Sequence, residues 1–156
     1  MSSDAPSPPP VFRLQTFLPH QLAVLANRTS EGFSAIYSAG FGLSVPEWRI
    51  LATLGEGSPI RAKDIEAIRH MHKTVVSRAV ATLQERDLVT ATANADDKRE
   101  RFLALTEAGR ALFEEIVPLG LAYEGQVLGE LEAEERTELQ RLLGKLIART
   151  SSDPGR

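Results

Sequence analysis

The chain has 156 residues, of which 42% are hydrophobic and 25% are charged, and its formal net charge is −3. These values suit one globular domain and exclude a disordered chain, and no apolar run approaches the roughly 18–20 residues that span a bilayer. The absence of cysteine excludes disulfides, thiol-based oxidant sensing, thiolate nucleophiles and thiolate metal sites.

The chain begins with a Ser- and Pro-rich stretch, MSSDAPSPPP, and residues 1–12 are predicted to be a flexible leader. The stretch lacks the basic and apolar regions of a signal peptide, which favours a cytoplasmic protein. The first helix is expected over residues 19–41, where the apolar side chains fall on one helical stripe, and it should end at the glycines of AGFG.

Two short helices are predicted next. Ser44 and Glu47 have the spacing of a capping box, so a helix should begin there and run to about Leu54. A further short helix is expected in IRAKDIEAIRH, with Ile65 and Ile68 facing inward.

The following stretch, HKTVVSRAVATLQERD, predicts an amphipathic helix. Its inner face should hold Val76, Ala79, Val80 and Leu83, with Val75 at the margin. Its outer face should hold Thr74, Ser77, Arg78, Ala81 and Glu85.

The runs LVTATAN and RFLALT are β-prone and flank six consecutive charges at residues 96–101, which predicts a hairpin with a charged tip. Thr106 should cap the helix that follows, and Pro118 should kink or break that helix. A last helix is expected over residues 134–149, with an apolar stripe of Leu139, Leu142, Leu143, Leu146 and Ile147.

This order of elements favours a helix-turn-helix followed by a β-hairpin wing. In a helix-turn-helix, the second helix enters the DNA major groove and its N-terminal half contacts base edges. Residues 61–101 carry nine basic and seven acidic side chains, whereas residues 111–156 carry five and nine. The charge pattern therefore allows an anionic partner at the middle of the chain only.

The candidate DNA contacts on the second helix are His72, Lys73, Thr74, Ser77 and Arg78. A guanidinium can donate two hydrogen bonds to guanine, the hydroxyls can reach a base or a phosphate, and Ala81 can meet a thymine methyl. The alternative is an exposed helical face with no partner. His70 and His72 diverge by about 200° on a helix, so no metal site is predicted.

The candidate DNA contacts on the wing are Lys98, Arg99 and Arg101, with Asp97 as a support. An arginine at the tip of a two-stranded ribbon can enter the electronegative minor groove. Asp97 can hold the Arg99 guanidinium through a bidentate pair. The alternative is a solvated hairpin tip.

Three segments, GLSVPEWRILATL, KTVVSRAVATLQERDLV and DDKRERFLALTEAGRALF, resemble the MarR family of winged-helix transcriptional regulators. The wing pattern of that family, Asp-x-Arg followed by Leu-Thr-x-x-Gly, is matched by Asp97, Arg99, Leu105, Thr106 and Gly109. The resemblance covers roughly residues 15–149.

Two positions depart from the family pattern. Asp87 stands where the family usually has glycine, and the turn is expected to survive because Asp tolerates the left-handed conformation. The short helix expected in IRAKDIEAIRH also lacks the usual hydroxyl cap, since Arg61 occupies that position.

The resemblance implies a mainly α fold with a small β-hairpin wing, in which terminal helices join two copies into a homodimer. It implies a flexible leader, an N-terminal dimerisation helix, a winged helix-turn-helix lobe, C-terminal dimerisation helices and a flexible tail. These are expected at residues 1–12, 13–43, 44–110, 111–150 and 151–156.

The same resemblance implies a ligand-responsive regulator, most simply a repressor, that binds a pseudo-palindromic operator. A small-molecule site is implied between the dimerisation region and the DNA-binding lobe. The segments FLPHQLAVLANR and LSVPEWR resemble relatives associated with aromatic-acid or aryl-CoA catabolism, so an aromatic carboxylate or its CoA thioester is the expected effector.

The candidate ligand contacts are His20, Arg28, Phe33, Tyr37 and Trp48. The alternative is that the three aromatic side chains are ordinary core residues. Arg28 can equally extend along apolar surface or pair with an acidic residue of a second subunit.

An enzyme is not expected, because the chain has no G-x-S-x-G, no glycine-rich phosphate loop and no H-E-x-x-H. No cofactor, metal or membrane partner is expected either. The remaining alternative is a winged-helix module used only for protein–protein contact, in which Arg78 and Arg99 would be dispensable.

Overall fold

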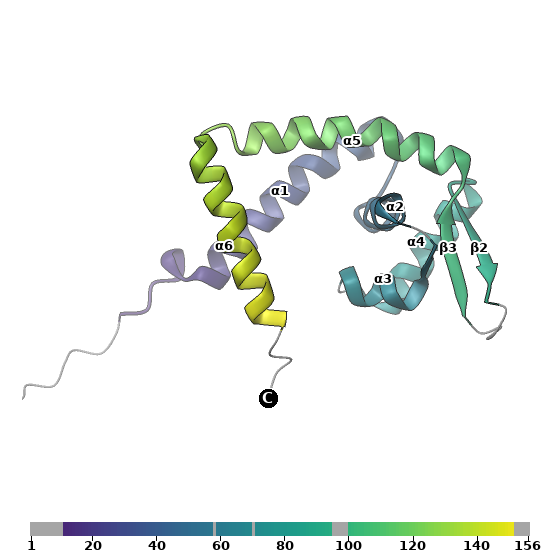
Figure 1. Ribbon diagram of the computed structural model, residues 1–156, viewed down its shortest axis with the longest axis horizontal. Coiled ribbons are helices and arrows are strands. Elements are labelled where there is room, and N and C mark those ends of the chain that lie inside the picture. Colours follow the sequence, from purple (N-terminus) through teal and green to yellow (C-terminus); the bar gives the residue numbers. More distant parts are fainter. Residues whose placement is uncertain (1–10, 58, 70, 95–99, 152–156) are drawn as a thin grey trace, which may run out of the picture.

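The computed structural model describes residues 11–57, 59–69, 71–94 and 100–151 (Figure 1). In chain order, their elements are η1 (Leu14–Thr16), α1 (Leu18–Phe41), α2 (Val45–Glu56), β1 (Ile60–Arg61), α3 (Ala62–Arg69), α4 (Lys73–Glu85), β2 (Val89–Ala93), β3 (Arg101–Leu105), α5 (Glu107–Val127) and α6 (Ala133–Ser151). The predicted mainly helical fold with a winged hairpin is confirmed. No helix in the described ranges is long and apolar enough to cross a membrane.

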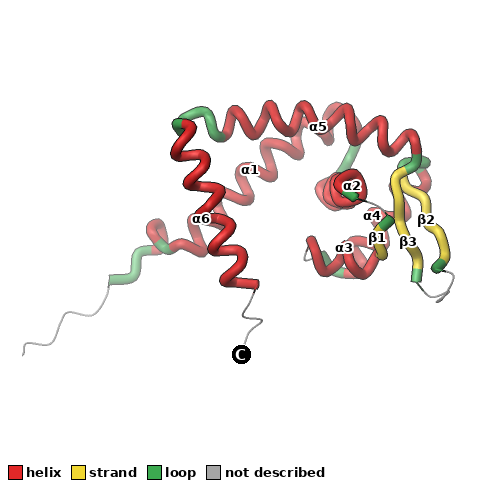
Figure 2. Tube along the Cα trace, viewed as in Figure 1, coloured by secondary structure: helices red, strands yellow, loops and turns green. Residues whose placement is uncertain are grey.

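A long helix, α5, connects the two ends of the molecule (Figure 1). The winged lobe, formed by α2, α3, α4 and the small sheet, lies at the end where α5 begins, and α6 lies at the other end (Figure 2). The helix α1 packs against α5, while α2 packs against α4, α5 and β3. The lobe and the terminal helices are therefore joined through α1, α2 and α5.

The predicted hairpin is confirmed, with β2 and β3 antiparallel from the Val89–Leu105 pair to the Ala93–Arg101 pair. The sheet also has a third strand, because Ile60 and Arg61 pair with β3 and give the order β1-β3-β2. A two-residue strand has no hydrophobic period, and the sequence pattern therefore did not predict β1.

The helix starts follow the predicted caps. The Ser44 hydroxyl accepts a hydrogen bond from the Glu47 amide at 3.4 Å, and the Glu47 carboxylate accepts one from the Ser44 amide at 2.9 Å. Thr106 caps α5 in the same way, accepting from the Gly109 amide at 2.9 Å. Both caps satisfy amide groups that the first helical turn would leave unpaired.

The core lies where α1, α2, α3, α4, the sheet and α5 meet. Its fully buried members include Tyr37, Leu43, Ile50, Leu51, Leu54, Ile65, Val76, Leu83 and Ile116. The expectation that Ile68 faces inward is wrong, because Ile68 is 55% exposed. It lies about 60° around the helix from Ile65 and in the last turn of an eight-residue helix, beyond the core position that Ile65 fills.

Pro118 lies inside α5 and does not end it. Of the two predicted alternatives, the break is therefore wrong, and the kink stays a prediction. A proline in a helix interior removes one amide donor. The packing of α5 against α1, α2 and β3 offsets that loss, and the helix continues to Val127.

The turn after α4, residues 86–88, joins four elements. Asp87 has a φ of 56°, the left-handed conformation that was predicted for it. Its carbonyl oxygen accepts a hydrogen bond from the Thr106 hydroxyl at 2.6 Å, and the Leu88 carbonyl accepts one from the Thr106 amide at 3.1 Å. The start of α5 is thus bound to the end of α4.

Arg86 connects the same turn to α1. Its guanidinium donates to the carbonyl oxygen of Phe41 at 2.8 Å and to that of Gly42 at 3.1 Å. Gly42 ends α1 in the left-handed conformation, with a φ of 64°. A cation at the C-terminus of a helix interacts favourably with the helix dipole, so this contact stabilises the end of α1.

Replacing Gly109 by alanine is expected to destabilise the protein by about 3 kcal/mol. A Cβ at this position would clash with the carbonyl oxygen of Leu88 and lie 2.9 Å from its carbonyl carbon, and backbone atoms cannot rotate away. The free energy of unfolding in urea, measured at a fixed protein concentration, tests this expectation.

Gly125, in the same helix, supplies the matched control. A Cβ there would meet no atom within 4 Å, so Gly125→Ala should stabilise α5 by about 0.5–1 kcal/mol. Equal effects of the two substitutions would contradict the steric explanation.

Candidate functional site

The outer face of α4 presents the predicted polar side chains together. Val76, Ala79 and Leu83 are buried on the inner face. The exposed side chains away from that face include those of Lys73, Thr74, Ser77, Arg78, Ala81 and Glu85. His72 is the N-terminal flanking residue of the helix, and its side chain is also exposed. This face offers a cation, two hydroxyls and a guanidinium within two helical turns.

The wing is the β2–β3 hairpin of the winged lobe. Arg101 opens β3, pairs with Ala93 across the hairpin and is exposed. The predicted contacts Lys98 and Arg99 and the predicted support Asp97 lie outside the described residues.

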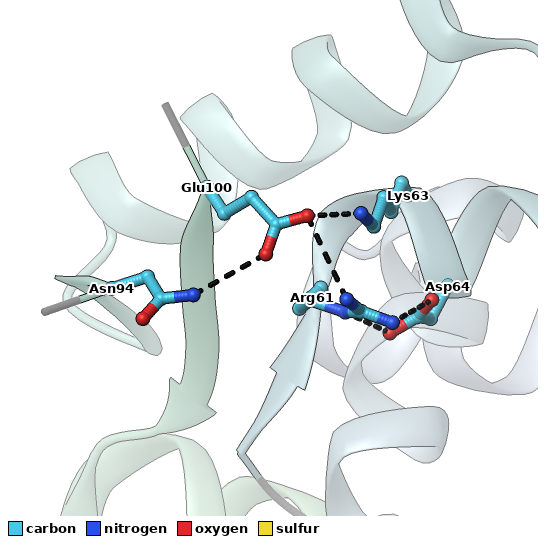
Figure 3. Close-up of polar contacts among 5 residues, drawn as sticks. All are labelled: Arg61, Lys63, Asp64, Asn94 and Glu100. Carbon is cyan, nitrogen blue, oxygen red and sulfur yellow. Dashed lines mark hydrogen bonds and ion pairs between the residues drawn. The ribbon is translucent and has the colours of Figure 1, made fainter. Parts of the chain in front are cut away.

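A polar network connects the residues that flank the tip of the wing, Asn94 and Glu100, to β1 and the start of α3 (Figure 3). The Glu100 carboxylate forms an ion pair with the Lys63 ammonium and lies 3.6 Å from Nη1 of Arg61. It also accepts a hydrogen bond from the Asn94 side-chain amide at 3.3 Å. Arg61 donates in addition to both carboxylate oxygens of Asp64, at 2.7 and 3.1 Å.

The network stabilises the charged forms of its acids. The hydrogen bond from Lys63 lowers the pKa of Glu100, and the hydrogen bond from Arg61 lowers the pKa of Asp64. The contact between Glu100 and Lys63 was not predictable from the sequence, because it joins residues 37 positions apart and depends on β1 pairing with β3.

A cluster of aromatic rings fills the space between α1, α2 and α5. The Phe33 ring lies 5.0 Å from Tyr37, 5.4 Å from Trp48 and 5.8 Å from Tyr123, measured between ring centroids. Trp48 also stacks with Tyr37 at 5.6 Å and with Phe113 at 6.3 Å. Three of the predicted ligand residues, Phe33, Tyr37 and Trp48, are thus brought together.

These rings form the inner end of a cavity of about 1070 Å³. Besides the rings, the inner end is lined by Arg49, Ala52 and Val117. The cavity continues towards the terminal helices, where it is lined by Leu22, Leu25, Leu139, Leu143, Leu146 and Ile147. Ligand pockets of this kind are concave and mostly apolar, with a few polar groups.

The other two predicted ligand residues lie elsewhere. His20 and Arg28 line a separate hollow of about 290 Å³ on α1, together with Gln15, Gln21 and Val24. Leu25 borders both hollows, so the two groups lie on adjacent sides of the same helix.

Two glycines allow the ring-filled contact between α1 and α5. A Cβ on Gly32 would clash with the Tyr123 ring, 2.8 Å from its Cζ atom, and a Cβ on Gly120 would lie 3.0 Å from the Phe33 ring. Each helix therefore receives a ring from the other at a position without a side chain.

Arg110 joins α5 to the end of α2. Its guanidinium donates to the Gly55 carbonyl oxygen at 2.9 Å and lies 5.8 Å from the centroid of the Phe113 ring. Arg49, Phe113 and Tyr123 line the cavity although sequence analysis did not select them. Arg49 lies next to Trp48, which is the only signal in the sequence that could have indicated it.

Comparison with known proteins places this geometry among transcriptional regulators. A model described as the MarR family matches residues 41–100. The transcriptional regulator HosA of Escherichia coli is 26% identical over 105 residues, which cover 67% of this chain and 78% of HosA.

Solved structures agree with this assignment. A MarR/EmrR family transcriptional regulator from Acinetobacter sp. ADP1 is 30% identical, with a TM-score of 0.81 over 91% of this chain and 100% of that chain. CouR from Rhodococcus jostii RHA1, bound to p-coumaroyl-CoA, shares the fold with a TM-score of 0.74 at 18% identity, over 86% of this chain and 94% of CouR.

Tyr37 is expected to ionise only above its ordinary pKa of about 10, because burial raises the pKa of its phenol and Arg49 offsets only part of that effect. The raised pKa means that the Tyr37 contribution to stability is complete below about pH 10 and is lost as the pH rises through the folded-state pKa. The chain has two tyrosines, so ultraviolet titration of the Tyr123→Phe variant observes Tyr37 alone.

The same variant in concentrated urea is the control, and there Tyr37 should titrate at about pH 10. Identical titration of the folded and unfolded protein would contradict the burial of Tyr37.

Proposed function

Because the chain belongs to the MarR family of winged helix-turn-helix transcriptional regulators, which are not enzymes, we propose that it represses transcription as an effector-released homodimer on a pseudo-palindromic operator. The observation that carries the proposal is the outer face of α4, where Lys73, Thr74, Ser77 and Arg78 are exposed together. This face has the size and chemistry that a major groove accepts.

The DNA contacts divide into two kinds. The Arg78 guanidinium donates to guanine, and Thr74 and Ser77 donate to a base or a phosphate. His72 and Lys73, at the start of α4, contact phosphates, as do Lys98, Arg99 and Arg101 on the wing when the duplex lies across both elements. Arg99 enters the minor groove, supported by Asp97.

The proposed homodimer rests on α6. None of the 19 residues of α6, all of which the structure describes, is buried. Its large apolar side chains are nevertheless spaced as one helical stripe, at Leu142, Leu143, Leu146 and Ile147. Such a stripe is stable only when another surface covers it, and a second copy offers the same stripe and the exposed apolar start of α1.

The effector is proposed to be an aromatic carboxylate or its CoA thioester. Stacked rings at the inner end of the cavity suit a planar aromatic group, and Arg49 supplies a cation for the carboxylate. CouR, which shares the fold, binds a thioester of this class. We assign the aromatic group to Phe33, Tyr37 and Trp48, and we reserve His20 and Arg28 for the phosphates of a thioester.

The packing of α2 connects the cavity to α4, and through this connection the effector releases the protein from its operator. This helix lines the cavity and also packs against α4. Two recognition helices must lie roughly 34–36 Å apart to contact both half-sites. An effector that binds more tightly to a conformation with a different helix spacing lowers the affinity for the operator. The reduction is limited by the ratio of the effector's affinities for the two conformations.

Selection of duplexes from a random pool, at two salt concentrations, is expected to yield a two-fold symmetric motif with half-sites about one turn apart. Replacing Arg78 by alanine should relax the base preference at one position in each half-site, at a cost of about 1–3 kcal/mol, because its bidentate contact is lost. Replacing Arg99 by alanine should weaken binding to all duplex sequences alike. It should also reduce the slope of log K against log salt by about 1.

Arg13→Ala removes the same charge from an exposed residue before η1 and should change neither quantity. An unchanged motif for Arg78→Ala would overturn the base contact. The absence of any enriched duplex would favour the alternative function, a winged-helix module for protein–protein contact.

Trp48 is the only tryptophan of the chain and lines the cavity. Its fluorescence is expected to change when phenolic acids or their CoA thioesters bind, and the same ligands should release the operator. Replacing Arg49 by alanine should weaken the binding of an aromatic acid by about 1.5–3 kcal/mol, the contribution of a hydrogen bond to a charged group.

The matching phenol without a carboxylate is the control, and it should bind to wild type and to Arg49→Ala with equal affinity. Absence of any fluorescence change and of any heat across the whole panel would exclude this class of effector.

A further inference from the structure

An acidic side chain stands beside the tip of the wing, which the proposed function places against DNA. Glu100 immediately precedes β3, and its backbone carbonyl accepts a hydrogen bond from the Asn94 amide at 3.0 Å, closing the hairpin. Its side chain is only 22% exposed, and its carboxylate lies between Asn94 of the hairpin and Lys63 at the start of α3 (Figure 3). A carboxylate in this position repels phosphates, so its charge does not by itself favour DNA binding.

The Glu100 carboxylate lies against two cations, Lys63 and Arg61. Lys63 is 56% exposed on α3, and the Glu100 carboxylate is its ion-pair partner. Arg61 lies 3.6 Å from the same carboxylate and is also bound through two hydrogen bonds by Asp64.

The two cations are therefore held to different degrees. Without the Glu100 charge, Arg61 would remain bound by Asp64. Lys63 would lose the acidic partner shown in Figure 3 and would be free to extend towards a phosphate.

The two modes of DNA binding respond differently to such a cation. Binding to arbitrary DNA depends on the number of cations that reach phosphates, whereas base preference depends on how α4 and the wing are held. A free Lys63 would add to the first mode on every sequence. Loss of the contact between the wing and α3 would at the same time weaken the second mode.

We propose that Glu100 is a specificity-determining residue, which keeps Lys63 from phosphates and fixes the wing against α3. This inference rests on the proposed function, because it assumes that the winged lobe binds DNA. Glu100 lowers affinity for arbitrary duplexes more than it lowers affinity for the operator.

The test measures the dependence of binding on salt, for an arbitrary duplex and for the selected operator. The variant Glu100→Gln keeps the size of the side chain and can still accept from Asn94. It is expected to bind the arbitrary duplex several-fold more tightly at low salt, with a slope of log K against log salt that is steeper by about 0.9, the value of one added phosphate contact. Its ratio of operator affinity to arbitrary affinity should fall several-fold.

The variant Lys63→Gln, alone and combined with Glu100→Gln, tests whether Lys63 is the cation that the Glu100 charge holds. Because Lys63 is held in wild type, the single variant should keep the wild-type slope, and the double variant Glu100→Gln with Lys63→Gln should return to it. Glu138→Gln is the matched control, since Glu138 is also paired with an arginine, Arg141, but lies on α6.

The outcomes separate the two proposals. If wild type binds no duplex even at low salt, the proposed function fails and this inference fails with it. If wild type binds DNA but Glu100→Gln leaves the slope unchanged or weakens binding to the arbitrary duplex, this inference alone is overturned.

Discussion

The direction of α4 depends on how its last turn is bound. The carbonyl oxygens of Asp87 and Leu88 accept hydrogen bonds from Thr106, and Gly109 brings the backbone of α5 against that of Leu88. Arg86 binds the end of α1 from the same turn. The helix proposed to contact bases is therefore attached to α1 and α5, two of the helices that line the cavity. Movement of α1 relative to α5 must be taken up at this turn.

The outer end of the cavity and the exposed apolar stripe of α6 lie on the same part of the surface. The inner end of the cavity is closed by side chains of α1, α2 and α5, whereas its outer end is bordered by a helix with no buried residue. A covering subunit would complete that outer wall, so the volume open to an effector and the stability of the terminal helices depend on the same surface. In the proposed homodimer, ligand affinity and dimer affinity would then be thermodynamically linked.

The features that sequence predicted correctly are those that depend on neighbours in the chain. The Ser44–Glu47 cap, the Thr106 cap and the left-handed Asp87 each involve residues within a few positions. Contacts between distant segments were not predictable in this way: β1 exists because β3 lies beside it, and Glu100 meets Lys63 across that pairing. Arg49 belongs to no sequence motif. The helix α5 continues through Pro118, with Gly109 packed against Leu88 before it and Gly120 packed against Phe33 after it. The proposed DNA and ligand contacts stay predictions.

The contact between α1 and α5 consists of rings inserted opposite Gly32 and Gly120, with the Phe33 and Tyr123 rings stacked between the helices. Rings packed in this way cannot slide by small amounts, because a partial shift leaves voids and forfeits dispersion contacts. The two helices therefore have a small number of discrete arrangements instead of a continuous range. In the effector-released regulator proposed above, such a contact would make the response a change in the fraction of molecules in each arrangement, not a gradual deformation of one arrangement.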